Sequence, residues 1–180
     1  MKRHFVLLAG LALFVLATPP QEAEAQVSFG PQVVLWDFDE LAVGGRVDFG
    51  LADAFGIEEG TFSELRGSAN VSYIFGDSER IGNEEWSWSG LLINANAVVP
   101  FDIDAAVTPF AGVGINHTRF SSSFSGAGLG SFGFSGSSSG LNLLGGLEFG
   151  LGSIPAFTEL QYSTSGAGAL SLSFGVMFGG

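Results

Sequence analysis

The segment Ala169-Leu-Ser-Leu-Ser-Phe-Gly-Val-Met-Phe178 decides the fold, because large apolar side chains alternate in it with mostly small ones. Successive side chains of a β-strand point to opposite faces. One face carries Leu170, Leu172, Phe174, Val176 and Phe178, and the other carries Ser171, Ser173, Gly175 and Met177. A strand of a water-soluble sheet usually sets charged residues opposite its apolar row, whereas this second row is uncharged. Because a tilted strand of ~9–11 residues crosses the hydrocarbon core of a membrane, the segment predicts a transmembrane strand.

The same alternation recurs along the chain, in segments separated by clusters of Gly, Ser, Asp and Pro that are typical of turns. We predict strands over residues 27–36, 41–50, 63–75, 87–99, 106–119, 141–151, 156–164 and 169–178. Eight is the smallest number of strands usual for bacterial outer-membrane barrels, and an even number leaves both termini at one end. The sequence therefore predicts an all-β fold, an eight-stranded antiparallel up-and-down transmembrane β-barrel, over residues 26–180.

The composition favours a barrel in a membrane over a soluble domain. The mean hydropathy is +0.39, and the chain contains 28 glycines and 18 phenylalanines. Apolar side chains of a barrel face lipid, and glycines relieve crowding in a narrow lumen. The formal net charge of −12 excludes a nucleic-acid partner, which would require a basic surface. The absence of cysteine excludes both a disulfide framework and a lipoprotein anchor.

The N-terminus, residues 1–25, has the pattern of a secretory signal peptide. Residues 1–4, Met-Lys-Arg-His, form a basic n-region, and residues 5–17 form an uninterrupted apolar stretch. As a helix that stretch rises only about 20 Å, which is too short to span ~30 Å of hydrocarbon. An A-x-A pattern at residues 23–25 predicts cleavage after Ala25 and export to the cell envelope.

The connections between the predicted strands differ in length. If the N-terminus is periplasmic, the connections after the first, third, fifth and seventh strands are extracellular. Residues 76–86 and 121–140 then form long extracellular loops, and the Ser/Gly-rich composition of the second predicts a mobile loop. Residues 100–105 and 152–155 are short periplasmic turns, whereas residues 51–62 are longer than this rule predicts. Most acidic residues fall in the connections, where solvated loop tips account for them.

Charged residues also occur within the predicted strands, on the face that carries the small side chains and not on the face that carries the large apolar ones. A basic side chain at mid-bilayer on the lipid face costs ~2–4 kcal/mol, so we expect these side chains in the lumen. The predicted lumenal charge network consists of Arg46, Asp48, Arg66, Glu148 and Glu159. The two arginines are expected to meet the two glutamates. An eight-stranded interior is only wide enough to be filled by side chains, which favours a polar plug, and a gate in a narrow channel is the alternative.

Three stretches resemble the fifth, sixth and seventh strands of small outer-membrane barrels: VTPFAGVGIN at 107–116, GLNLLGGLEFG at 140–150 and FTELQY at 157–162. The chain is similar to the opacity-type porin family and to OmpA-like eight-stranded membrane domains. The resemblance implies crossing salt bridges in the interior and outer-membrane lipid around the barrel. It also implies periplasmic chaperones and the barrel-assembly machinery as partners during biogenesis. Family members commonly end on an aromatic residue that this machinery reads, whereas here Phe178 is followed by two glycines.

No catalytic, cofactor-binding or metal-binding residue is predicted. His117 lies close to Ser121, but no acid is placed by spacing to orient its ring, so we expect a solvated or interfacial histidine. One histidine without cysteine gives no metal-ligand pattern, and no glycine pair precedes a helix and a lysine as in a phosphate loop. Trp36, Trp86 and Trp88 at the outer strand ends predict an aromatic girdle, with sugar binding as the alternative.

These features predict an integral outer-membrane β-barrel protein that is not an enzyme. It is expected to have a structural or surface-interaction role through its extracellular loops, without a cofactor. The sequence does not identify the extracellular partner. Three alternatives stay open: a narrow gated pore, an outer-membrane lipid-modifying enzyme that uses His117, and a soluble lipocalin-like calyx that binds an apolar ligand. A calyx would leave strands such as 169–178 with only small side chains toward water, which is poor for solubility.

Overall fold

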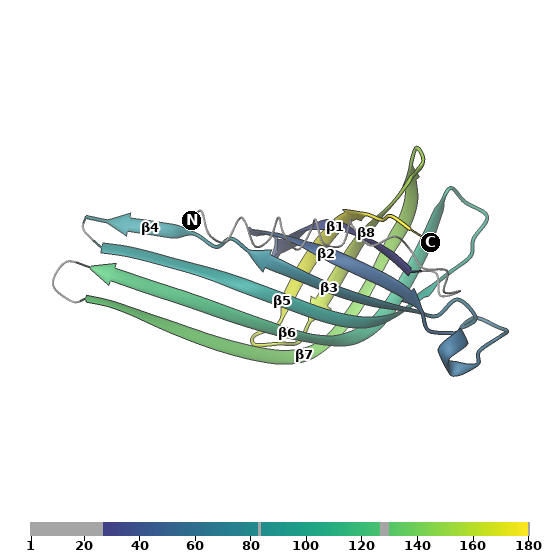
Figure 1. The fold of residues 1–180 in the computed structure, drawn as a ribbon, viewed down its shortest axis with the longest axis horizontal. Coiled ribbons are helices and arrows are strands. Elements are labelled where there is room, and N and C mark those ends of the chain that lie inside the picture. The colour runs from purple at the N-terminus through teal and green to yellow at the C-terminus, as the bar shows by residue number, and fades with distance from the viewer. Residues whose placement is uncertain (1–26, 83, 127–129, 180) are drawn as a thin grey trace.

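β-Strands make up most of the structure, a computed structural model that describes residues 27–82, 84–126 and 130–179 (Figure 1). The predicted signal peptide, residues 1–25 with cleavage after Ala25, lies outside the described residues. The strands are β1 (Val27–Trp36), β2 (Glu40–Gly50), β3 (Arg66–Ile74), β4 (Ser78–Ile81), β5 (Glu84–Pro100), β6 (Val107–Gly126), β7 (Gly130–Leu151), β8 (Ile154–Ser163) and β9 (Ala169–Val176). A short 3-10 helix, Asp53–Phe55, lies between β2 and β3. No helix in these described ranges is long and apolar enough to cross a membrane.

Backbone pairing closes the sheet into a barrel. Neighbouring strands pair antiparallel, β3 pairs with β5, and β1 pairs with β9 to complete the ring. Counted over the described residues, eight strands form the ring, and β4 lies outside it, paired with β5. The predicted fold class, an eight-stranded antiparallel up-and-down barrel, is confirmed.

The alternation of side chains gives the barrel an apolar outer face and a polar inner face. Val113 and Ile115 of β6 are each 60% exposed, whereas the next residue, Asn116, is 5% exposed. On β9, Ser171 and Ser173 are likewise buried. The large apolar rows are therefore available to lipid, and the small and polar rows line the lumen.

The predicted long loops at 76–86 and 121–140 are wrong, because both segments contain strand. β6 and β7 pair continuously from Val107↔Phe149 out to Gly126↔Gly130. Serine and glycine are typical of turns, but phenylalanines at alternate positions among them mark a sheet with two different faces. In the first segment, β4 pairs with the beginning of β5. The hairpins therefore satisfy their backbone hydrogen bonds well beyond the barrel.

This additional pairing builds an extension that projects from one end of the barrel. β5, β6 and β7 have 17, 20 and 22 residues, whereas β9 has 8 and β3 has 9. Figure 1 shows these three long strands running side by side past the ends of β1, β2 and β3, with β4 at their far end. We define the extension as β4 together with residues 84–89, 121–126 and 130–135, which lie beyond the last β3–β5 pair, Ile74↔Gly90.

The opposite end of the barrel carries the connections that the sequence placed in the periplasm. Residues 152–153 form a two-residue turn between Leu151 and Ile154, and Gly152 adopts a φ of 67°, which favours glycine. Residues 101–106 connect β5 to β6. The long exception is residues 51–65, which contain the 3-10 helix. The connections at this end are therefore short except for residues 51–65, the segment that the sequence already predicted to be longer than the others.

Candidate functional site

The lumen is the candidate site, because most of the buried polar side chains of the described residues converge there. Each comes from the inward row of its strand: Gln32, Arg46, Asp48, Ser68, Asn70, Ser72, Asn94, Asn96, Asn116, Thr118, Asn142, Glu159, Gln161, Ser163, Ser171 and Ser173. Buried polar groups are stable only when they are hydrogen-bonded. The contacts among these side chains therefore determine what the lumen can do.

Arg46 stands at the centre of a buried charged layer. Its Nε donates a hydrogen bond to Asp48 Oδ1 at 2.7 Å, and its Nη1 donates to Glu159 Oε2 at 2.8 Å. The side chains of Arg46, Asp48 and Glu159 are 1%, 7% and 3% exposed. One guanidinium thus joins two neighbouring inward positions of β2 to the far wall on β8, in the charge-assisted geometry that is strongest for arginine.

Two aromatic rings enclose this guanidinium. Arg46 Cζ lies 4.3 Å from the ring centroid of Phe157 and 5.8 Å from that of Phe110. Glycines make room for the rings: a Cβ on Gly146 would clash with the Phe110 ring, and a Cβ on Gly175 would clash with the Phe157 ring. The rings pack against the guanidinium and add a cation–π attraction of ~1–2 kcal/mol.

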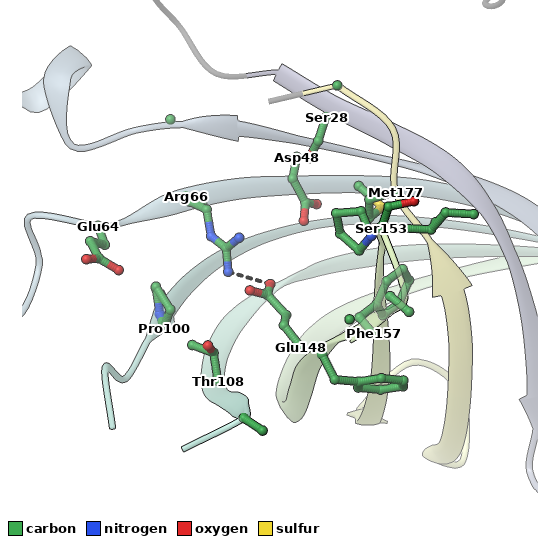
Figure 2. A pocket seen from close by; sticks show the side chains of 18 of the residues that line it. Ser28, Asp48, Glu64, Arg66, Pro100, Thr108, Glu148, Ser153, Phe157 and Met177 are labelled. Carbon is green, nitrogen blue, oxygen red and sulfur yellow. Dashed lines mark hydrogen bonds and ion pairs between the residues drawn. The ribbon is translucent and has the colours of Figure 1, made fainter. Parts of the chain in front are cut away.

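Arg66 and Glu148 form a second ion pair, nearer the end of the barrel that carries the 152–153 turn. Arg66 Nη2 donates to Glu148 Oε1 at 2.6 Å, and both side chains are about one-quarter exposed. The pair faces a cavity of about 1010 Å³ that opens at this end, shown in Figure 2 with Asp48 and Phe157 on its wall. Arg66 Nε is buried without a hydrogen-bond partner among the described residues.

The five residues of the predicted charge network therefore lie in two groups. Arg46, Asp48 and Glu159 form the buried layer, and Arg66 and Glu148 lie at the wall of the cavity. Within the part of the chain that the structure describes, no ion pair joins the two groups. The alternation along each strand predicts that all five side chains point into the lumen. Their positions along the barrel axis depend on strand tilt and register, which the alternation does not determine.

A layer of amides lies next to the charged layer, and sequence reasoning missed it as a unit. Asn142 Nδ2 donates to Asn94 Oδ1 and Asn96 Oδ1 at 3.0 and 2.9 Å, and Asn142 Oδ1 accepts from Asn116 Nδ2 at 2.7 Å. Asn94 Nδ2 in turn donates to Asn70 Oδ1 at 2.8 Å. The available signal was an asparagine at an inward position on each of β3, β5, β6 and β7.

An apolar cluster fills the lumen at the end that carries the extension. Its buried members are Val34, Ala42, Ile74 and Leu92, and Trp36, Trp88 and Phe120 pack against them. Trp36 and Trp88 lie with their ring centroids 5.4 and 5.9 Å from that of Phe120. The predicted aromatic girdle is wrong for Trp36, Trp86 and Trp88, because their even positions belong to the inward rows, which Trp86 continues beyond the barrel.

The layers divide the lumen into two unequal spaces. Asp48 lines the large cavity, whereas Glu159 lines a second cavity of about 20 Å³, enough for about one water. The Arg46 ion pairs therefore lie between the two spaces. Beyond the small cavity, Trp36 and Leu92 lead into the apolar cluster. The interior is thus a cavity open at one end and closed by charged, amide and apolar layers in succession.

His117 lies on the outward face, away from this interior. Its Nδ1 is 2.8 Å from Ser139 Oγ, on the neighbouring strand β7. Its contacts give no carboxylate that orients the ring as in a hydrolase triad. In the described ranges, no group of three or more histidine, aspartate and glutamate side chains is placed to hold a metal ion.

Comparison with known proteins gives similarity at the level of structure. No protein-family model and no curated protein matches the sequence. The chain is similar to Neisserial surface protein A, NspA, with 16% identity and a TM-score of 0.53, over 85% of this chain and 94% of that one. It is similar to the N-terminal β-barrel domain of Pseudomonas aeruginosa OprF, with 14% identity and a TM-score of 0.53, over 89% of this chain and 100% of that one. The fold is that of small outer-membrane β-barrels.

A further similar structure is a major outer membrane protein from Thermus thermophilus. It shares 10% identity and a TM-score of 0.66, over 88% of this chain and 100% of that one. At such identities the likeness concerns the fold alone. The resemblance to small outer-membrane barrels that the sequence suggested is confirmed in that respect.

Proposed function

We propose that this chain is an integral protein of the bacterial outer membrane with a structural or surface-interaction role. Export would proceed through the signal peptide, cleaved after Ala25, with periplasmic chaperones and the barrel-assembly machinery as partners during biogenesis. The observation that carries the proposal is the inversion of polarity: apolar rows face outward and the charged and amide layers face inward. Such an arrangement is stable where hydrocarbon surrounds the molecule.

The apolar belt has the height that a membrane requires. On β5, β6 and β7 the outward row contains no polar or charged side chain over residues 91–99, 107–115 and 141–149, each of which has about the length that crosses the hydrocarbon core, ~9–11 residues. Beyond them the outward row changes to Ser89, His117 and Ser139. The extension therefore belongs outside the membrane, at the end opposite the periplasmic turns.

The polarity argues against the soluble calyx. An apolar ligand would need an apolar interior, whereas most of the interior of this barrel is lined by hydrogen-bonded polar side chains. The three closing layers likewise favour a plugged lumen over a gated pore. The placement of His117, which contacts only a serine hydroxyl through its Nδ1, gives no support to lipid hydrolysis.

Membrane fractionation of the full chain tests the proposal. The protein should stay in the outer-membrane fraction through high salt and alkaline carbonate and be released by detergent. The variant Ala111→Arg, which puts a charge on the lipid face at the middle of the apolar belt of β6, should lower the folded yield, because the substitution costs ~2–4 kcal/mol there. The matched variant Ser123→Arg, on the same outward row of the extension, should not. Release of the unmodified protein by salt alone would contradict the proposal.

A further inference from the structure

The extension carries aromatic side chains on one of its two faces. Cross-strand pairing aligns Trp86 of β5, Phe124 of β6 and Phe132 of β7, and Phe134 lies on the same face one pleat nearer the barrel. Side chains paired in this way point to the same side of the sheet. We call these four residues the aromatic face. They continue the inward rows of the barrel, so this face rises from the lumen mouth and does not face lipid.

The aromatic face is open to solvent. Trp86, Phe132 and Phe134 are 44%, 48% and 70% exposed. The rings contact one another: the centroid of Phe132 lies 5.0 Å from that of Phe124 and 5.6 Å from that of Phe134, the latter edge to face. Trp86 Nε1 is held by a hydrogen bond to Ser122 Oγ at 2.9 Å. A contiguous, ordered and exposed apolar cluster of this kind is typical of an interaction site.

The other face of the extension is almost free of apolar side chains. Its outward row contains Ser87, Ser89, Ser121, Ser123, Ser125, Ser131, Gly133 and Ser135. A sheet that projects into water on both sides has no need to sort its side chains in this way. The sorting therefore indicates that the aromatic face serves a contact that the serine face does not.

The charge on the aromatic face is negative. Glu79 pairs with Trp86 and shares its face. Glu84 Cγ and the Phe124 ring are the nearest neighbours that a Cβ added to Gly126 would meet, so the Glu84 side chain also lies beside the rings. The arginine of this region points the other way: Arg80 pairs with Glu85 on the serine face, with Nη2 2.7 Å from Oε2. Among the described residues of the extension, the aromatic face therefore carries carboxylates without a basic side chain.

We propose that the aromatic face binds a cationic amphipathic polypeptide segment supplied by another protein. Its apolar side chains would pack on the phenylalanine rings, and its lysine or arginine side chains would meet Glu79 and Glu84. Trp86 adds a ring face for cation–π contact beside Glu79. The inference deepens the proposed surface role and rests on it, because the extension must lie outside the membrane.

The charge distribution selects this partner over others. An anionic polymer or phosphate-rich surface would be repelled by the carboxylates. A second copy of the chain, packed face to face, would bring the same carboxylates together. A neutral sugar would use the rings but would gain nothing from the negative charge.

A peptide titration tests the inference with the full chain inserted into phosphatidylcholine nanodiscs. The probe is a synthetic peptide of alternating leucine and lysine, and the matched probe replaces each lysine with glutamate. The lysine peptide should bind, with an affinity that falls as salt rises, and the glutamate peptide should not. The double variant Phe132→Ser, Phe134→Ser should weaken binding at least ~10-fold. The variant Glu79→Gln, Glu84→Gln should weaken it and reduce its salt dependence.

Glu85→Gln, on the serine face, is the control and should leave binding unchanged, and a heat-dependent gel shift checks that each variant is folded. Equal affinity for the two peptides, or no loss on removing the rings, would overturn the inference. Binding of a neutral oligosaccharide in place of the peptide, or self-association abolished by Phe132→Ser, would also overturn it.

Labelling of intact cells separates this inference from the proposed function. The chain has no cysteine, so Ser123→Cys supplies a single thiol on the extension. A membrane-impermeant maleimide should label it from outside. Absence of labelling would contradict the outer-surface placement itself, whereas labelling without peptide binding would contradict only the aromatic face as a peptide site.

Discussion

Arg46 satisfies two carboxylates at once, and this makes it the residue on which the charged layer depends. Its partners Asp48 and Glu159 are both buried, and each is bonded to the same guanidinium. Removing one partner of a buried pair is strongly destabilising, because it leaves an uncompensated charge. Loss of the arginine would leave both carboxylates buried without a cationic partner.

Arg46→Ala should therefore destabilise the folded barrel by at least ~3–5 kcal/mol, measured by urea unfolding in detergent with tryptophan fluorescence. The triple variant Arg46→Met, Asp48→Asn, Glu159→Gln removes all charge together and should recover most of the loss. Arg80→Ala, which breaks the exposed pair with Glu85, should cost less than ~1 kcal/mol. A cost for Arg46→Ala as small as that of Arg80→Ala would contradict a stabilising role for the layer.

Gly146→Ala should destabilise the barrel by ~1–3 kcal/mol, because the added Cβ meets the Phe110 ring and the Thr158 carbonyl. Gly145→Ala is the matched control. The Cβ there would face outward with Phe110 O 3.6 Å away as its nearest neighbour, so the change should stay within ~0.5 kcal/mol. Unfolding of both variants under the same conditions gives the comparison, and equal effects would show that the lumen tolerates the methyl group.

At the scale of the elements, the sequence predicts the barrel strands well and the extension poorly. Residues 27–36 are predicted with the bounds that β1 has, because the stretch is rich in valine and aromatic residues and is followed directly by Asp37, a turn residue. The barrel parts of β6 and β7 are predicted, but their continuation beyond residues 119 and 141 is missed because the serine- and glycine-rich composition there resembles a turn. What keeps the segment extended is pairing along both strands, and pairing is not a local property of either one.

The candidate site shows the same division between local and long-range information. The alternation of side chains along each strand predicts inward positions for five charged residues: Arg46, Asp48, Arg66, Glu148 and Glu159. It does not determine that Arg46 reaches Glu159 while Arg66 reaches Glu148, because strand tilt sets which positions face one another across the barrel. The inward tryptophans could have been recognised from their even numbers, had the alternation been carried to the ends of β1 and β5.

At the scale of the whole molecule, the lumen combines three different barriers in series. Charged, amide and apolar layers lie between the large open cavity and the extension. An ion would have to displace a buried ion pair and then cross a dry cluster that contains Ile74 and Leu92. We therefore expect that no single substitution opens the barrel.

Planar-bilayer recordings should accordingly show no steady conductance for the unmodified protein. Arg66→Ala should also be silent, because the Arg46 layer and the apolar cluster remain intact behind the cavity. A stable current in the unmodified protein, or one that appears with Arg66→Ala, would contradict the plugged lumen and favour a narrow pore.

The continuous pairing of β6 with β7 has a consequence for how this molecule can change in length. Each pair added to or removed from the hairpin moves every more distal side chain to the opposite face, because the pleat repeats every two residues. Insertions or deletions that keep the rings on one side must therefore occur in steps of two residues in both strands at once. The projection can grow or shrink under this rule while the barrel below it keeps its register.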